Sequence, residues 1–362
     1  MRIGIVGGIF GKDEAWQKEM LSAPERVLQL GLIRRGHEVV TRSLDDEPPS
    51  DCDIVHCHHF GYASLRCSTS RVPFVFTSHN PFIASQFHNR QYYMLLVPGM
   101  IVLNRADFVV ALSNTERNIF NSRFGVPNDR IRLIRNGLIP GLYQQPRLDY
   151  NHKQDVPRLL YVAQLEFFKG IEYLLVAFKN LVRRYNDLQL DIVSQNRRML
   201  KTYQDLCLAY GISSSVRFMG PLSMKELVAA YHRCTLYVHP SLAEDLPTAI
   251  SEAMMCGKPV IASTVAGIPE QVDENVGILV PPGDPSAISE AVTTLLEDPS
   301  LVRDMGKRAK ERAMNLFDCN TMCKLHEELY KETIELDERR GRRIEGGLYR
   351  LIWRARARMR SG

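Results

Sequence analysis

Short runs of β-branched and aromatic residues alternate with helix-like segments along most of this chain, and no other feature limits its fold so strongly. Such alternation is typical of parallel β-sheets whose strands are joined by crossover helices. In the first half we predict six strands, over residues 2–6, 38–41, 53–56, 74–78, 108–112 and 131–134. In the second half we predict six more, over 158–162, 189–193, 216–219, 236–239, 260–263 and 277–280. The helices between the later strands should begin near residues 170, 198, 223, 248 and 286.

A chain of 362 residues is longer than one hydrophobic core usually supports. Between the two strand series, residues 143–157 lose the apolar pattern and are rich in Gln, Pro, Asn, His and Lys, so we place a linker there. We predict one domain over 1–150, a second over 151–336 and a tail over 337–362. The predicted fold class is α/β, with two doubly wound, Rossmann-like domains that face each other across a cleft. Ligands of such sheets bind at the carboxyl ends of the strands.

The first crossover helix carries its own boundary signals. Ser22 followed by Glu25 three residues later is a capping-box pattern, which predicts the start of this helix. Gly36 is expected to end it in front of the second strand.

Charge is divided unevenly along the chain. The net charge is +5, but residues 339–362 contain nine Arg and one Glu, so the tail carries +8 and the remainder −3. The slightly acidic body gives no charge support for nucleic-acid binding. If residues 344–360 are helical, the apolar side chains gather on one side and most arginines on the other. We expect such a tail to bind an anionic membrane surface, with a solvated basic tail, favoured by Gly346-Gly347, as the alternative.

Nothing at the amino terminus resembles a signal peptide, and the longest apolar stretch, residues 92–103, is too short to cross a membrane. We therefore expect a cytoplasmic protein, peripheral on the inner face of the cytoplasmic membrane where the tail binds. The eight cysteines are then expected to be reduced thiols. The His- and Cys-rich run over residues 56–59 is not expected to bind zinc. We expect its side chains to point to opposite faces of a strand, and no second Cys/His pair follows at finger spacing.

The glycines after the first strand exclude one kind of nucleotide site. A nicotinamide-binding fingerprint needs a glycine at position 6, where Val6 stands, and an acidic end to the second strand, which runs into Thr41 and Arg42. A dehydrogenase is therefore not expected. Gly7 and Gly8 still let backbone amides approach a phosphate or a sugar closely, although a plain tight turn explains them equally well.

The most informative segment spans residues 239–270. A predicted strand ends at His239, a loop holds Glu244, and a helix begins near Thr248, where the unpaired amides of the first turn suit a diphosphate. Glu252, one turn into the helix, is placed to accept hydrogen bonds from ribose hydroxyls, and Glu244 from hexose hydroxyls. By spacing alone, a solvated helix region is the more common explanation for two such glutamates.

This segment resembles the donor-binding signature of glycosyltransferase family 4 enzymes of the GT-B fold: Glu, seven residues, Glu, then Ala-Met, Gly and Pro-Val. The similarity continues through residues 266–270 and 277–284, and backward through 105–107, 110–113, 124–127 and 136–137. The resemblance covers residues 1 to about 336. It implies a retaining transfer of a hexose from a UDP- or GDP-linked sugar, with no metal ion and no other cofactor. It also implies a C-terminal helix that crosses back to the first domain.

The resemblance also implies residue roles. Glu244 would contact the transferred sugar, Glu252 the ribose and Lys169 the diphosphate. His79 matches a histidine that lies over the sugar, with a structural histidine as the alternative. We therefore predict His79, Glu244 and Lys169 as catalytic residues. The predicted donor-binding set is Gly7, Gly8, Gln164, Lys169, Glu244, Asp245, Leu246, Pro247, Thr248 and Glu252.

Three positions depart from the family pattern. Gln164 stands where the family has Arg, Asp245 stands where Gly is common, and residues 194–196 replace a glycine-rich turn. The first two weaken the charge complementarity to a diphosphate. A non-catalytic sugar-nucleotide-binding protein is therefore an alternative function, and a nucleotide-sugar epimerase on the same fold is another.

The acceptor side is less well defined by the sequence. We expect a glycan or lipid-linked acceptor, as in cell-surface polysaccharide or glycolipid synthesis, to meet the first domain. Residues 9–21 are predicted to form a long loop that serves as an acceptor wall. Residues 92–103 are predicted as a core helix, with a lipid-facing helix as the alternative.

Overall fold

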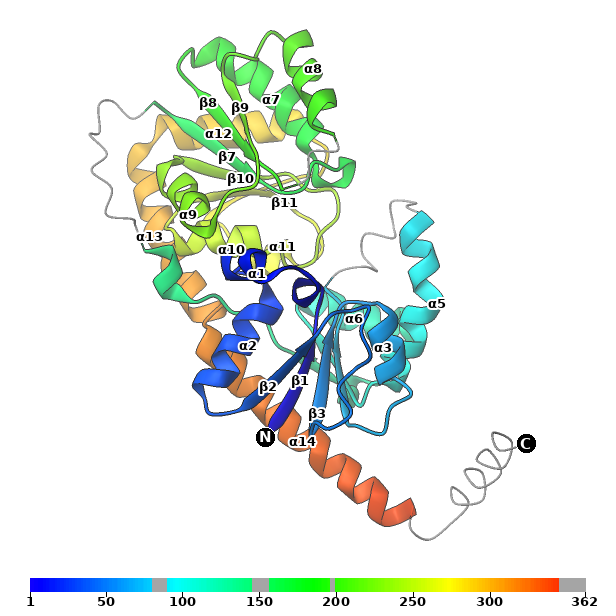
Figure 1. The fold of residues 1–362 in the computed structure, drawn as a ribbon. Helices are drawn as coiled ribbons and strands as arrows, with labels where there is room; N and C mark the ends of the chain where they lie inside the picture. The colour runs from blue at the N-terminus through cyan, green and yellow to red at the C-terminus, as the bar shows by residue number, and fades with distance from the viewer. Residues whose placement is uncertain (80–89, 145–155, 196–198, 345–362) are drawn as a thin grey trace.

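The computed structural model describes residues 1–79, 90–144, 156–195 and 199–344, and it has two lobes (Figure 1). The first lobe contains a parallel six-stranded sheet in the order β2-β1-β3-β4-β5-β6. Its strands are β1 (Arg2–Val6), β2 (Glu38–Arg42), β3 (Ile54–His58), β4 (Phe74–Thr77), β5 (Phe108–Ala111) and β6 (Ile131–Leu133). Its helices are α1 (Glu14–Glu19), α2 (Pro24–Arg34), α3 (Tyr62–Cys67), α5 (Arg90–Arg105) and α6 (Asn114–Phe124), with short 3₁₀ turns η1 (Gly8–Gly11), η3 (Asn128–Arg130) and η4 (Pro140–Tyr143).

The second lobe repeats this architecture with the strand order β12-β11-β10-β7-β8-β9, again all parallel. Its strands are β7 (Arg158–Val162), β8 (Gln189–Val193), β9 (Val216–Met219), β10 (Leu236–His239), β11 (Val260–Ser263) and β12 (Gly277–Val280). Its helices are η5 (Phe167–Lys169), α7 (Ile171–Arg184), α8 (Leu200–Ala209), α9 (Met224–Arg233), α10 (Thr248–Met255), α11 (Ile268–Gln271), α12 (Pro285–Glu297) and α13 (Pro299–Leu316). Central strands such as β10 and β11 are buried throughout, because two separate apolar cores cover the two faces of this sheet.

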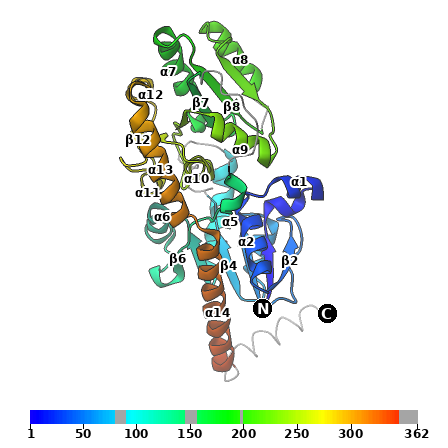
Figure 2. The same cartoon turned by 90° about the vertical axis from the view of Figure 1, so that its left-hand side faces the viewer.

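The last helix, α14 (Cys319–Ile344), returns to the first lobe and runs along it, as both views show (Figures 1 and 2). Its residues Cys323 and Tyr330 are buried in the core that contains Ile3 and Ile5 of β1. Glu327 of α14 also contacts the first lobe, since it forms an ion pair with Arg35 and a hydrogen bond with His37, each at 2.6 Å. The predicted fold class and the returning C-terminal helix are confirmed.

All twelve predicted strands are present, and their ends differ from prediction by at most two residues. The predicted helix starts in the second lobe are equally close. The boundary that we predicted between residues 150 and 151 lies outside the described residues, as does most of the predicted amphipathic segment of the tail.

Two predictions about the segment before α2 are wrong. Residues 9–21 are not one long loop, because they contain η1 and α1, whose start is capped by Asp13 accepting from the Trp16 amide at 2.8 Å. The Ser22–Glu25 capping box does not form. The helix begins at Pro24, and the Glu25 carboxylate is buried and accepts a hydrogen bond from the Ile9 amide instead, at 3.3 Å.

No helix in the described ranges combines the length and the apolar character needed to cross a membrane. The apolar stretch at 92–103 lies within α5, where Val102 and Leu103 are fully buried while Met100 and Ile101 are each 44% exposed. This end of the stretch therefore belongs in part to the core, as predicted.

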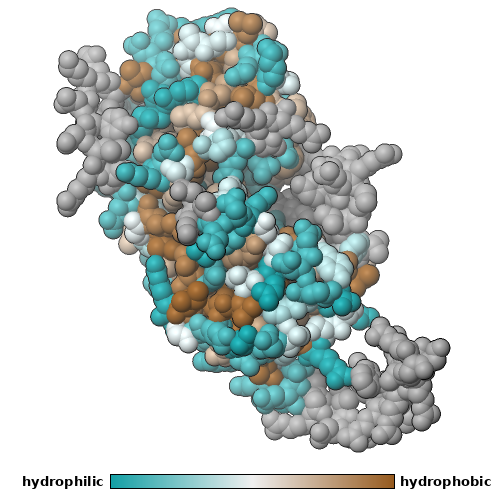
Figure 3. Space-filling model, in the orientation of Figure 1, coloured by the Kyte–Doolittle hydropathy of each residue, from teal (hydrophilic) through white to brown (hydrophobic). Residues whose placement is uncertain are grey.

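On the face drawn in Figure 3, hydrophobic residues gather over α2, where Ile33 is exposed.

Candidate functional site

A cavity of about 650 Å³ lies between the two lobes and is lined by residues of both. It sits at the carboxyl ends of parallel strands, because β3, β4 and β7 each end directly before residues that line it, and the last residue of β10, His239, lines it as well. The first lobe supplies Pro24, His59, Phe60, Ser78, His79, Leu112 and Asn136. The second lobe supplies residues 162–164, Glu166, Phe168, Lys169, His239 and 244–249. The structure therefore places the cavity where ligands of doubly wound sheets bind.

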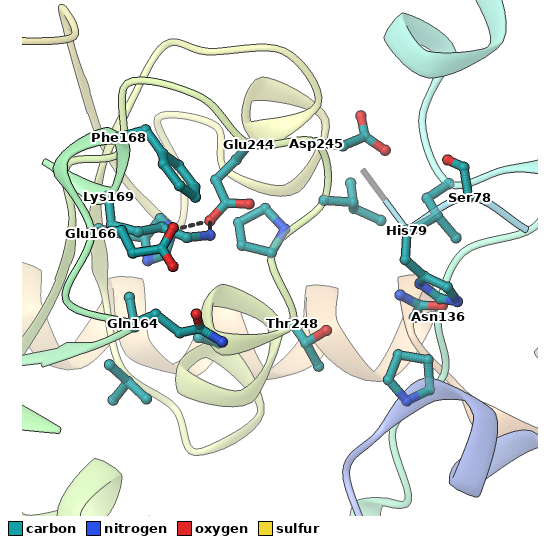
Figure 4. A pocket seen from close by; sticks show the side chains of 18 of the residues that line it. Ser78, His79, Asn136, Gln164, Glu166, Phe168, Lys169, Glu244, Asp245 and Thr248 are labelled. Carbon is teal, nitrogen blue, oxygen red and sulfur yellow. Dashed lines mark hydrogen bonds and ion pairs between the residues drawn. The ribbon is translucent and has the colours of Figure 1, made fainter. Parts of the chain in front are cut away.

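Lys169 and Glu244 form an ion pair at the centre of the second-lobe wall (Figure 4). Glu244 is 6% exposed and also accepts a hydrogen bond from His239 at 3.3 Å. Burial by itself would raise the pKa of Glu244, but Lys169 and His239 lower it to about 2. The carboxylate is therefore ionised at neutral pH, and it is a strong hydrogen-bond acceptor on the cavity wall.

Two backbone segments, residues 168–170 and 240–242, pack closely together beside this pair. The Leu242 amide donates to the Phe168 carbonyl at 2.7 Å. Gly170 adopts φ +73°, and a Cβ atom there would lie 1.9 Å from the Pro240 carbonyl oxygen. Only glycine fits this position, so η5 and the loop after β10 hold Lys169 and Glu244 at a defined separation.

The amino end of α10 lines the cavity next to this pair. Thr248 is its first residue, and the preceding Pro247 provides no side-chain cap. The first amides of the helix are therefore left for a ligand, in a position where the helix dipole favours an anion. Leu246, Pro247 and Thr248 all line the cavity, as predicted.

Gln164 also lines the cavity, so the site presents an uncharged amide where the family pattern has Arg. Next to it along the chain, Leu165 lines a second cavity of about 150 Å³. This smaller cavity is mainly apolar and includes Ile192, Leu200 and Phe218.

His79 lies on the opposite wall, on the first lobe (Figure 4). It follows β4 in a left-handed backbone conformation, φ +46°, which is uncommon outside glycine. Its Nε2 lies 2.8 Å from Nδ1 of His58, so these two rings share one hydrogen. Burial, followed by the neighbouring histidines, lowers the pKa of His79 well below its ordinary value, so that the ring is neutral at pH 7.

His58 belongs to a cluster of histidines next to this wall. The ring centroids of His56 and His58 are 4.2 Å apart, and those of His56 and His326 are 5.2 Å apart. Our expectation that the histidines of this strand point apart is therefore wrong for His56 and His58, because alternate residues of a strand share a face. Among the described residues, no three His, Cys, Asp or Glu side chains are arranged to hold a metal ion.

Four predicted site residues lie differently from the rest. Glu252 does not line the cavity. Its carboxylate is buried and accepts hydrogen bonds from the hydroxyls of Tyr143 at 3.1 Å and Tyr231 at 2.9 Å. Gly7 and Gly8 also lie outside the cavity lining, and Gly7 packs against the side chain of Glu25.

Asp245, the fourth, lines the cavity but turns away from Lys169. Its Oδ1 accepts a hydrogen bond from the Ser113 hydroxyl of the first lobe. Our expectation that Asp245 weakens the charge complementarity to a diphosphate is therefore not supported by its position.

Sequence reasoning missed several residues of the site, among them Ser78, Asn136, His59, Glu166 and Phe168. For Ser78 and His59 a signal was present, since each comes directly after the end of a buried strand. For Asn136 the signal was the resemblance at residues 136–137, whereas Phe168 carries no comparable signal.

Comparisons with known proteins agree with this architecture. The family model described as Glycosyltransferase Family 4 matches residues 26–140, and the model described as Glycosyl transferases group 1 matches residues 145–312. An uncharacterized glycosyltransferase of Methanocaldococcus jannaschii is 26% identical over 78% of this chain and 76% of its own length. A D-inositol 3-phosphate glycosyltransferase of Corynebacterium efficiens is 27% identical over 81% of this chain and 75% of its own.

Solved structures share the fold over nearly the whole chain. The sucrose-phosphate synthase of Thermosynechococcus elongatus has a TM-score of 0.79 at 22% identity, and it covers 93% of this chain and 100% of its own. Anabaena HepE, solved in complex with UDP-glucose, has a TM-score of 0.73 at 20% identity over 92% of this chain and 100% of its own. With two GT-B lobes, and with both halves matched by transferase family models, the chain belongs to the family 4 glycosyltransferases.

Proposed function

We propose that this protein is a retaining glycosyltransferase that moves a hexose from a nucleotide-diphosphate sugar to a glycan or a lipid-linked acceptor. The observation that carries the proposal is the Lys169–Glu244 pair, which faces the interlobe cavity beside the uncapped amino end of α10. A cation and a helix start favour a diphosphate, and the buried carboxylate favours a sugar diol.

The donor diphosphate is proposed to lie against Lys169 and the first amides of α10. The ammonium group of Lys169 has three N–H donors, and one of them is directed to Glu244. The others are then available to the phosphate oxygens. Gln164 adds a neutral N–H donor, so the proposed diphosphate-binding residues carry one positive charge fewer than in the family pattern.

The hexose is proposed to lie between Glu244 and His79, which stand on opposite walls of the cavity (Figure 4). Glu244 is ionised and accepts from sugar hydroxyls, while the neutral His79 ring offers a hydrogen bond without a competing charge. As the glycosidic bond to the diphosphate breaks, the leaving oxygen takes the electron pair, and Lys169 and α10 stabilise its charge. The acceptor hydroxyl forms the new bond to the anomeric carbon on the same face and passes its proton to the leaving phosphate.

A UDP- or GDP-sugar is the proposed donor, with no metal ion. Anabaena HepE, which shares this fold, is described in complex with UDP-glucose. The apolar cavity of about 150 Å³ beyond Leu165 is a suitable place for the base. Gly7 and Gly8 remain proposed donor contacts.

Glu252 remains a proposed ribose contact. It lies one turn into α10, whose amino end is the proposed diphosphate site, so a ribose next to that diphosphate would lie near its carboxylate.

We further propose that the protein works in the cytoplasm, on the inner face of the cytoplasmic membrane, and that residues 339–362 bind anionic lipid there. The nine arginines of this segment support such binding electrostatically. A lipid-linked acceptor would then be presented next to the first lobe.

The proposed function is tested by incubating the protein with a panel of UDP-, GDP- and ADP-sugars and measuring the release of free nucleotide. We expect release from one donor, increasing when an acceptor extract is added. An altered sugar that stays attached to its nucleotide would show an epimerase instead. Donor binding with no release under any condition would show a non-catalytic protein.

A further inference from the structure

Asp245 and Glu116, two carboxyl groups from different lobes, lie in one buried cluster at the edge of the cavity. Asp245 is 1% exposed and Glu116 is 2% exposed. Asp245 directly follows Glu244 in the second lobe, whereas Glu116 lies in the first turn of α6 in the first lobe. Figure 4 shows the two neighbours diverging, with Glu244 directed toward Lys169 and Asp245 toward the side where Ser78 lies.

A chain of hydrogen bonds connects these groups across the lobe boundary. The Ser113 hydroxyl donates to Asp245 Oδ1 and accepts from the Glu116 amide at 2.9 Å. Glu116 in turn accepts from the Ser78 hydroxyl at one oxygen and from the Leu112 amide, at 2.8 Å, at the other. Asp245 directly follows Glu244, and Ser78 directly precedes His79. These hydrogen bonds therefore connect the segment that holds Glu244 to the segment that holds His79.

Among the described residues, no cation forms an ion pair with Asp245 or Glu116. The nearby Glu270 pairs with Arg135 at 3.1 Å and accepts from the Asn114 amide at 2.8 Å, so that cation is already engaged. Lys169 is engaged by Glu244. Asp245 Oδ2 is buried and has no hydrogen-bond partner among the described residues.

Two adjoining buried carboxylates without a cation cannot both be ionised at moderate cost. Burial raises the pKa of Asp245 well above its ordinary value, and Glu116 and Glu270 raise it further. Burial also raises the pKa of Glu116, but the Ser78 and Leu112 hydrogen bonds oppose this change. The proton therefore belongs on Asp245, and the charge on Glu116. Two further titratable residues, Glu244 and His79, are next in sequence to Asp245 and Ser78.

We propose that Asp245 and Glu116 hold one proton between them and act as a positioning pair, which docks the Glu244 loop onto the Ser78–His79 turn. The pair thereby sets the distance between the two walls that hold the sugar, and in this respect it rests on the proposed function. Docking takes up one proton, so it weakens as the pH rises through the raised pKa of Asp245, when two buried charges oppose each other.

The test measures docking without any donor. Hydrogen exchange of the amides over residues 112–117 and 242–247, corrected for the intrinsic rate, is followed toward alkaline pH in the full chain. In the wild type, protection should fall about tenfold per pH unit between the ordinary pKa of Asp245 and its raised pKa, the range in which docking takes up one proton. Asp245→Asn, which keeps the shape of the neutral acid and cannot ionise, should show no such slope.

Glu116→Gln serves as the second variant. It removes one of the charges that raise the pKa of Asp245, so the slope should extend over a narrower pH range than in the wild type. Gly267→Ala is the packing control. A Cβ atom at Gly267 would lie 2.8 Å from Ser113 Cβ and 2.5 Å from the Asp245 carbonyl oxygen, so this variant should lower protection while the slope persists. An infrared carbonyl band from a protonated carboxyl should be present in the wild type and absent in Asp245→Asn.

The inference is overturned if Asp245→Asn keeps the wild-type slope, or if the infrared band is unchanged in that variant. These readouts need no donor, so their failure leaves the proposed transferase function intact. A positioning role in catalysis further requires that kcat/KM for the transfer falls in parallel with protection at alkaline pH, and that this fall is lost in Asp245→Asn. A kcat/KM profile that is the same in both proteins would remove that role.

Discussion

At Glu244, burial and the neighbouring Lys169 and His239 shift the pKa in opposite directions. Its folded-state pKa of about 2 lies below its ordinary value of 4.5, so the ionised form is favoured by folding. The stabilising contribution is therefore present above about pH 4.5 and is lost as the pH falls toward about 2. At 1.36 kcal/mol per pKa unit, this difference corresponds to about 3 kcal/mol.

This first prediction is checked by urea unfolding of the wild type and of Glu244→Gln at neutral and acid pH. The wild type should lose about 3 kcal/mol more than the variant across that window. Equal losses in the two proteins would show that Lys169 and His239 do not stabilise the carboxylate as the structure indicates.

Glu252 gives a second prediction at the residue scale. Glu252→Ala removes the acceptor of the Tyr143 and Tyr231 hydroxyls, so the free energy of unfolding should fall by about 2–4 kcal/mol. The same variant should weaken donor binding, if the carboxylate contacts the ribose. Tyr231→Phe is the matched control, because it breaks one of these hydrogen bonds and leaves the carboxylate in place. Donor affinity that is unchanged in Glu252→Ala would rule out the ribose contact.

At the scale of elements, η5 and the loop after β10 hold the ion pair through Gly170. Gly170→Ala should lower both stability and donor affinity, because its Cβ atom would meet the Pro240 carbonyl at 1.9 Å and displace Lys169. Gly211→Ala is the control. Gly211 has a similar φ of +69°, but nothing lies within 4 Å of its Cβ position.

Thermal unfolding and donor titration of both variants check this third prediction. Gly211→Ala should cost only the backbone strain, about 1 kcal/mol, and leave donor affinity unchanged. If the two variants behave alike, the close approach at Gly170 does not position Lys169.

The elements themselves were largely predictable from the sequence, because buried parallel strands are short apolar runs whose ends are marked by polar residues and turns. Helix caps were less predictable. At Glu25 the pattern of a capping box was present, but Pro24 begins the helix and the carboxylate contacts the Ile9 amide of the adjacent turn. A local pattern cannot reveal such a competing contact, since the partner is 16 residues away in the chain.

For the whole molecule, the site residues that the sequence identified come from both lobes. Lys169, Glu244 and Thr248 belong to the second lobe and His79 belongs to the first, and all four line the cavity. The contact of Asp245 with Ser113 was not predicted, because Ser113 belongs to the other lobe. Contacts of this kind depend on how the two lobes meet, which no local pattern encodes.

The basic tail supplies a fourth prediction at this scale. Deleting residues 339–362 removes a charge of +8, so the shortened protein should no longer sediment with anionic vesicles, while its activity on soluble substrates persists. Neutral vesicles are the control for nonspecific adsorption. Sedimentation with anionic vesicles that survives the deletion would assign membrane binding to another part of the chain.

The central claim is that Lys169 binds the donor diphosphate and Glu244 the hexose, and equilibrium titration tests it most directly. The nucleotide-sugar selected from the panel and the matching nucleoside diphosphate are titrated into the wild type, Lys169→Met and Glu244→Gln. We expect Lys169→Met to weaken both ligands about tenfold or more, which corresponds to about 1.4 kcal/mol or more. Glu244→Gln should weaken the nucleotide-sugar alone by a similar factor. Equal affinities for both ligands in all three proteins would contradict the assignment of this cavity as the donor site.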